Sequence, residues 1–214
     1  MAARILIADD HAVVREGLRI KIKAESDLKV VGEAENGREA VEMAKALKPD
    51  VIIMDIGMPE LNGIEATRQI CEFLPTVRII VLSMHNTKEH VFRAIQAGAM
   101  AYLLKGSTCS NIVKAVNSVL KGHQFFCDGI DVSWNTCRSD SCSISKSPIE
   151  SLSQREREVL QLVVDGKTSA EIAMFLNLSP KSVETYRSRL MLKLGIENIP
   201  SLVKFALLHG ITHN

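Results

Sequence analysis

Short apolar runs alternate with helical patterns over the first part of the chain. The runs are rich in β-branched residues, as buried strands are, and they cover residues 5–8, 28–31, 51–54, 79–82 and 101–104. The segments between them repeat apolar residues every three or four positions, which predicts helices. Strands that alternate with helices of this length predict crossover connections and a parallel sheet with helices on both faces.

The pattern changes after residue 122. Residues 123–150 have no steady period and are crowded with Ser, Asp and Cys, a composition typical of a linker. Cys127, Cys137 and Cys142, together with His123, could bind a metal or form a redox switch. Flexible reduced thiols are the simpler interpretation of these cysteines.

Helical patterns alone fill residues 151–214. Two capping boxes, in which Ser or Thr precedes Glu by three residues, begin apolar-periodic runs at 153–156 and 168–171. A Ser-Pro pair at 179–180 predicts the start of a third helix. The chain is therefore expected to contain an α/β domain at 1–122, with a doubly wound five-stranded parallel sheet, then the linker and an all-α domain.

Polar side chains follow the apolar runs of the α/β domain. The first run ends at Asp9 and Asp10, the third at Asp55, the fourth at Ser83 and the fifth at Lys105. Because parallel strands end along one edge of a sheet, these residues are expected to lie together. Three carboxylates gathered there would repel one another unless a cation lay among them, and oxygen ligands favour Mg²⁺. With a lysine and a hydroxyl to bind phosphate oxygens, the set predicts a site for phosphoryl transfer.

Asp55 is the best candidate for a covalent phosphoryl acceptor. It stands alone at the end of a strand, before a Gly-Met-Pro turn that opens the backbone around it, and a carboxylate can act as a nucleophile. The Asp9-Asp10 pair is better placed to hold the metal.

The motifs A-D-D-H, M-D-I-G-M-P-E-L-N-G, L-S-M and Y-L-L-K-G, in this order, resemble the receiver domain of two-component response regulators over about the first 120 residues. The resemblance implies a flavodoxin-like fold and phosphorylation of Asp55 by a sensor histidine kinase. It also implies an Mg²⁺ site, a lysine that pairs with the phosphoryl group and a conformational switch pair. These residues are Asp9, Asp10, Asp55 and the Gly57 carbonyl for Mg²⁺, Lys105 for the phosphoryl group, and Ser83 with Tyr102 for the switch.

The second and third predicted helices of the C-terminal domain are joined by a short turn at Asn177, and the third has a polar outer face, as in a helix-turn-helix. Residues 152–195 resemble the LuxR-type four-helix DNA-binding module, and with the receiver they are similar to the NarL/FixJ family of transcriptional regulators. The resemblance implies a homodimer on double-stranded promoter DNA, paired through a last helix around residues 202–208. Lys181, Glu184, Thr185 and Ser188 would face the major groove, and Arg187, Arg189 and Lys193 would lie near phosphates.

Charge and composition limit the DNA affinity and the location that we expect for this chain. The net charge is +1, and only the third helix of the C-terminal domain is clearly basic, so non-specific DNA affinity should be modest and dimer binding necessary. The apolar runs are too short to cross a membrane, no export signal begins the chain, and five cysteines without repeated C-x-x-C fit reduced thiols. We therefore expect a cytoplasmic regulator without membrane partners.

Two other functions fit part of the sequence. An aspartyl-phosphate enzyme, such as a haloacid-dehalogenase-like phosphatase, needs a second acid two residues after the nucleophile, where this chain has Gly57; it also leaves the C-terminal domain unexplained. A DNA-binding protein with an inert receiver that dimerises constitutively is the third possibility. A DNA-binding regulator that is not an enzyme is the expected function.

Overall fold

The computed structural model describes residues 2–84, 86–106, 109–126 and 148–211, and the chain divides into two units, Met1–Asp131 and Val132–Asn214. Most of the predicted linker, including Cys127, Cys137 and Cys142, lies outside the described residues.

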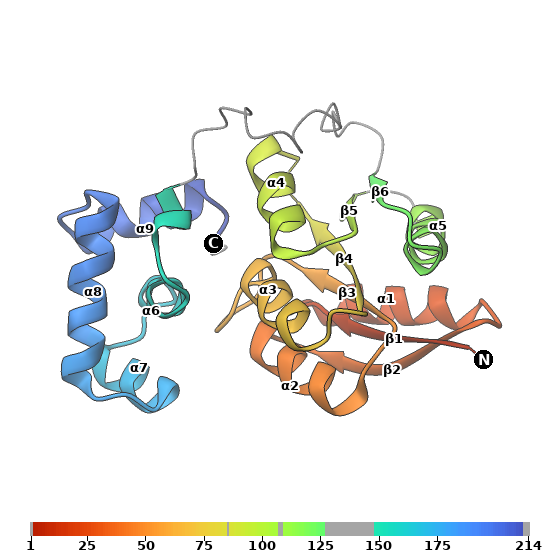
Figure 1. The fold of residues 1–214 in the computed structure, drawn as a ribbon, viewed down its shortest axis with the longest axis horizontal. Helices are drawn as coiled ribbons and strands as arrows, with labels where there is room; N and C mark the ends of the chain where they lie inside the picture. Colours follow the sequence, from red (N-terminus) through yellow and green to blue (C-terminus); the bar gives the residue numbers. More distant parts are fainter. Residues whose placement is uncertain (1, 85, 107–108, 127–147, 212–214) are drawn as a thin grey trace. The chain divides into compact units, whose positions relative to one another are not determined.

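A parallel sheet forms the centre of the first unit (Figure 1). Its strand order is β2-β1-β3-β4-β5-β6, and every neighbouring pair is parallel. The strands are β1 (Ala3–Ala8), β2 (Leu28–Ala34), β3 (Val51–Asp55), β4 (Arg78–Ser83), β5 (Ala101–Leu104) and β6 (Phe125–Phe126). This confirms the predicted doubly wound parallel sheet.

The sheet has one strand more than the five predicted. β6 contains only Phe125 and Phe126, which pair with Ala101 and Tyr102 of β5. Two residues are too few to show the alternating pattern of a strand, so the sequence pattern assigned them to the linker.

Five helices cover the two faces of this sheet. They are α1 (Ala12–Lys23), α2 (Gly37–Leu47), α3 (Gly63–Phe73), α4 (Lys88–Ala97) and α5 (Cys109–Leu120). α1 and α5 lie on one face and α2, α3 and α4 on the other (Figure 1). Successive residues of β3 alternate between the two faces: Ile53 packs with the α1 and α5 side, and Ile52 and Met54 with the other. Because both sides are buried, β3 and β4 are apolar apart from residues at their ends.

The loop after β3 folds back against the strand. The Gly63 amide donates to the Ile56 carbonyl at 2.8 Å, and a Cβ at Gly63 would lie 1.8 Å from the Asp55 carbonyl oxygen. Asn62, directly before it, caps α3 by accepting a hydrogen bond from the Glu65 amide at 3.0 Å. A glycine is required here because only it lets α3 begin so close to the end of β3.

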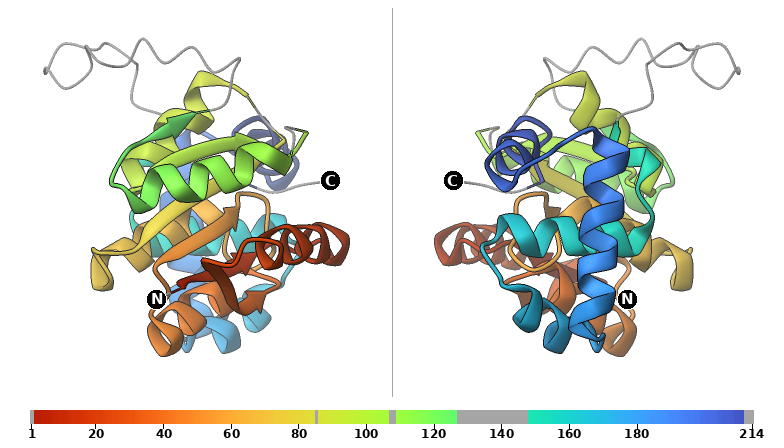
Figure 2. Two further views of the ribbon diagram at one scale, coloured as in Figure 1. Left: turned by 90° about the vertical axis from the view of Figure 1, so that its right-hand side faces the viewer. Right: turned by 90° about the vertical axis from the view of Figure 1, so that its left-hand side faces the viewer.

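The second unit is helical. It contains the short 3₁₀ helix η2 (Pro148–Ser151), then α6 (Gln154–Val164), α7 (Ser169–Leu176), α8 (Pro180–Leu194) and α9 (Ile199–Leu208). Both predicted capping boxes are present, at the starts of α6 and α7. Asn177 ends α7 in the left-handed conformation, with φ of 54°. α8 crosses α6 (Figure 2) and buries Val183 and Leu190 in one apolar core with α6, α7 and α9.

The two glycines at positions 63 and 17 should respond in opposite ways to replacement by alanine. Gly63→Ala is expected to lower the free energy of unfolding of the first unit by about 1–3 kcal/mol, because the new methyl group overlaps the Asp55 carbonyl. In Gly17→Ala, the matched control, the methyl group meets nothing within 4 Å in the middle of α1, so stability should rise by about 0.5–1 kcal/mol. Amide hydrogen exchange of the strands measures both. An alanine tolerated at position 63 would contradict the close approach.

Candidate functional site

Two buried carboxylates and one ammonium meet at the carboxyl edge of the sheet. Asp9 follows β1 and is fully buried, and Asp55 ends β3 with 2% of its surface exposed. The Lys105 Nζ atom, directly after β5, lies 2.7 Å from Asp55 Oδ2 and 2.9 Å from Asp9 Oδ2. The structure thus brings together three groups that are far apart in the sequence and were expected at this edge.

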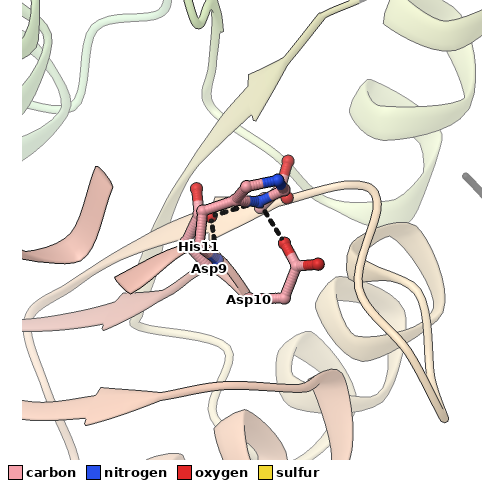
Figure 3. A group of neighbouring side chains, drawn as sticks. Asp9, Asp10 and His11 are labelled. Carbon is pink, nitrogen blue, oxygen red and sulfur yellow. Dashed lines mark hydrogen bonds and ion pairs between the residues drawn. The ribbon is translucent and has the colours of Figure 1, made fainter. Parts of the chain in front are cut away.

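Asp10 and His11 form the exposed rim of the same site (Figure 3). His11 Nδ1 lies 2.6 Å from Asp10 Oδ1 and 3.4 Å from Asp9 Oδ1, and the His11 amide donates to Asp9 Oδ1 at 2.9 Å. One ligand atom from each of Asp9, Asp10, His11 and Asp55 lies within 4.8 Å of the others. His11 was absent from the predicted site, although its place directly after the two aspartates was the available signal.

Burial and neighbouring charges set the pKa values of Asp55 and Lys105. Loss of solvent, followed by repulsion from Asp9, raises the pKa of Asp55 to about 6, although Lys105 acts in the opposite direction. Burial alone would lower the pKa of Lys105, but the carboxylates of Asp55 and Asp9 outweigh it and the pKa is raised. Near neutral pH the site therefore holds an ammonium and an ionised Asp55 carboxylate in a desolvated environment.

The other expected residues of this site lie on neighbouring segments. Ser83 ends β4 with 1% exposure, and its carbonyl accepts a hydrogen bond from the Lys105 amide at 2.8 Å. Tyr102 is fully buried on β5, opposite Val81 of β4. Gly57 is buried in the loop between β3 and α3.

Most of the residues expected at the DNA lie on one exposed surface of α8. Lys181, Glu184, Thr185, Ser188 and Arg189 are exposed, whereas Val183 and Leu190 of the same helix point into the core. The Thr185 hydroxyl donates to the Lys181 carbonyl at 2.9 Å, one turn earlier. This surface is polar over more than two turns and is suited to a groove of DNA.

Two of the cationic residues expected near DNA phosphates contact polar groups elsewhere in the second unit. Arg187 is partly buried, and its Nη1 lies 2.7 Å from Ser169 Oγ at the start of α7. Lys193 Nζ lies 2.6 Å from Glu156 Oε2 and 3.2 Å from the Ser151 carbonyl oxygen. Burial acts to raise the pKa of Glu156, but hydrogen bonds from Lys193 and Ser153 outweigh it, and the pKa is lowered. Through this ion pair, Lys193 links the end of α8 to the capping box of α6.

A doubly wound parallel sheet with an acidic site at its carboxyl edge, followed by a helix-turn-helix unit, defines the class of DNA-binding response regulators. Residues 5–117 match the response regulator receiver domain, and residues 150–206 match the bacterial regulatory proteins of the luxR family. The chain belongs to the NarL/FixJ family of response regulators, which control transcription.

Its similarity to known members extends over nearly the whole chain. It is 36% identical over 207 residues to the response regulator UvrY of Escherichia coli strain K12, covering 97% of this chain and 94% of UvrY. It is 36% identical over 210 residues to the oxygen regulatory protein NreC of Staphylococcus epidermidis, covering 95% of this chain and 96% of NreC. RcsB from Salmonella enterica serovar Typhimurium, solved bound to promoter P1flhDC with the phosphomimetic BeF3−, is 28% identical; the match has a TM-score of 0.58 and covers 99% of this chain and 100% of RcsB.

Asp55→Asn should stabilise the first unit in a pH-dependent way. The pKa of Asp55 is raised from 3.8 to about 6 by folding, so the acid favours the folded state below its unfolded pKa, and this contribution is lost as pH rises through about 6. In buffer with a metal chelator at about pH 7.5, the free energy of unfolding of the variant should be higher than that of the wild type by about 1–3 kcal/mol. The difference should shrink toward pH 4. Hydrogen exchange of β1 and β3 at several pH values checks this, and a difference independent of pH would contradict it.

Lys193→Met should destabilise the second unit, because it leaves the buried Glu156 carboxylate without its ammonium partner. We expect the free energy of unfolding to fall by about 1–3 kcal/mol, measured by hydrogen exchange of α6 and α8. Lys204→Met, which removes an exposed ammonium from α9, is the matched control and should have little effect. Equal stability of the two variants would show that Lys193 has no structural role.

Proposed function

We propose that Asp55 is the phosphoryl acceptor of a switch that controls DNA binding by the second unit. The observation that carries this proposal is the Lys105 ammonium, held at 2.7 Å from Asp55 and 2.9 Å from Asp9. A lysine in this place can bind the oxygens of a phosphoryl group attached to Asp55, in exchange for the carboxylates that it now contacts.

Mg²⁺ fits the groups around Asp55. Carboxylate oxygens of Asp9, Asp10 and Asp55 lie within reach of one another, and Mg²⁺ prefers such hard oxygen ligands in sites that handle phosphate. The Gly57 carbonyl is our fourth proposed ligand. The ion, when bound, supplies positive charge against the negative charge of the transferring group.

The phosphoryl donor is proposed to be a phosphohistidine of a sensor histidine kinase. A carboxylate oxygen of Asp55 attacks phosphorus, and the bond from phosphorus to the histidine nitrogen breaks, so the kinase histidine leaves with the bonding electrons. The ionised Asp55 carboxylate is the competent nucleophile, and a bound Mg²⁺ would favour this ionised form.

Phosphorylation adds about two negative charges and three acceptor oxygens at the end of β3. Ser83, at the end of the neighbouring strand β4, can donate its hydroxyl to these oxygens, and Tyr102 on β5 can occupy the space that this movement opens. The surface formed by α4 and β5 would then change and promote dimerisation. The RcsB structure supports this scheme, since that protein was bound to its promoter with a phosphomimetic.

A homodimer is proposed to bind an inverted repeat in promoter DNA. In each subunit the exposed surface of α8 enters the major groove, with Lys181, Thr185 and Ser188 toward base edges and Arg189 toward phosphate. α9 would pair the two subunits. We place this activity in the cytoplasm, where the DNA lies; in keeping with this, no helix in the described part of the chain has the length and apolar character to span a bilayer.

Beryllofluoride with Mg²⁺ should convert the wild-type protein from monomer to dimer. Its affinity for its promoter should then increase by at least about tenfold, because two linked subunits contact the DNA together. Asp55→Ala should show neither change, because the acceptor is missing. Sedimentation and DNA titration with the same reagents measure both effects. The proposal is wrong, and the receiver is inert, if modification of Asp55 is demonstrated and yet leaves the DNA affinity of the wild-type protein unchanged.

A further inference from the structure

Three side chains form a closed network where α7 begins beside α8. The Ser169 hydroxyl donates to Glu184 Oε1. Arg187 Nη1 donates to Ser169 Oγ at 2.7 Å and lies 3.3 Å from the same Glu184 oxygen. Glu184, which the resemblance places at the major groove, therefore has its carboxylate turned toward Arg187 and the start of α7.

The negative charge of Glu184 is unexpected on a surface that binds DNA, because DNA phosphates are also negative. Arg187 is one of the three residues expected near DNA phosphates, and its guanidinium is well suited to phosphate oxygens. In the structure an internal carboxylate takes part of its hydrogen-bonding capacity, and Glu184 itself remains more than half exposed, with 57% of its side chain accessible. A phosphate that approaches Arg187 must displace this carboxylate and also lie close to its negative charge.

We propose that Glu184 acts as an internal competitor of DNA phosphate for Arg187, and so lowers the affinity of α8 for DNA of any sequence. This inference rests on the proposed function, because it needs α8 to be the DNA-contacting helix. Its consequence is selectivity: weakening a contact that carries no sequence information lowers non-specific binding and makes base contacts and dimer formation decide where the protein binds.

Glu184→Gln separates this role from the alternatives. The amide is nearly isosteric and can still accept from Ser169, but it no longer competes by charge. Binding to a short duplex of random sequence should tighten roughly three- to tenfold. Because Arg187 becomes available to one more phosphate in each subunit, the slope of log K against log salt should steepen by about one per subunit. Both are measured on the full-length protein treated with beryllofluoride and Mg²⁺, by titration at several salt concentrations.

Two further variants control the measurement. Glu197→Gln makes the same change of net charge at an exposed position beyond the end of α8, and it should leave the salt slope unchanged. Arg187→Gln should cancel the gain when it is combined with Glu184→Gln, because the gain acts through the guanidinium. Hydrogen exchange of α7 and α8 confirms that each variant is folded.

The outcomes are distinct. A weaker Glu184→Gln variant that loses a preference for cytosine at one position would show that Glu184 reads a base, and would overturn the inference. An unchanged salt slope would show that the network is only structural, and would also overturn it. Lys181→Ala distinguishes failure of the proposed function: if it too leaves DNA binding unchanged, α8 is not the DNA interface, whereas if it weakens binding, only the role of Glu184 is wrong.

Discussion

The site at the carboxyl edge of the sheet depends on one ammonium placed between two buried carboxylates. Asp9 and Asp55 have almost no access to water, and two such charges side by side in a medium of low dielectric are strongly unfavourable without a partner. Lys105 contacts both of them, yet the pKa of Asp55 stays raised, at about 6. Burial is the largest cause of this raised pKa, and repulsion from Asp9 adds to it. With Asp10 beside them, one ammonium leaves these three acids with a net negative charge when they are ionised. The remaining negative charge favours the binding of a further cation.

The backbone holds this unfavourable arrangement in place. β1 and β3 are neighbours, with Ala8 opposite Met54, so their terminal aspartates must be close. β4 aligns Leu82 with Asp55, and the Lys105 amide is fixed to the Ser83 carbonyl. The apolar cores on both faces of the sheet stabilise these strands, and they offset the cost of the buried charges at the edge.

Much of this could be predicted from the sequence, because the signals are local. The apolar runs define the strands, the two capping boxes begin helices as expected, and the parallel topology requires the strand ends to converge. What escaped prediction depends on contacts between distant segments. β6 is defined only by its pairing with β5. Ser169, which accepts a hydrogen bond from Arg187, and Glu156, which pairs with Lys193, are 18 and 37 residues away on other helices. The pattern of α8 alone cannot show these contacts.

These internal pairs change the charge that α8 offers to DNA. The helix carries four cations, Lys181, Arg187, Arg189 and Lys193. Arg187 and Lys193 are paired with Glu184 and Glu156, whereas Lys181 and Arg189 have no ion pair within the described part of the chain. Since affinity for DNA rises with each phosphate neutralised, we expect a single subunit with two available cations to bind weakly. Two subunits on one site would add their contacts. The proposed switch would therefore have a large effect on binding if it acts on dimerisation.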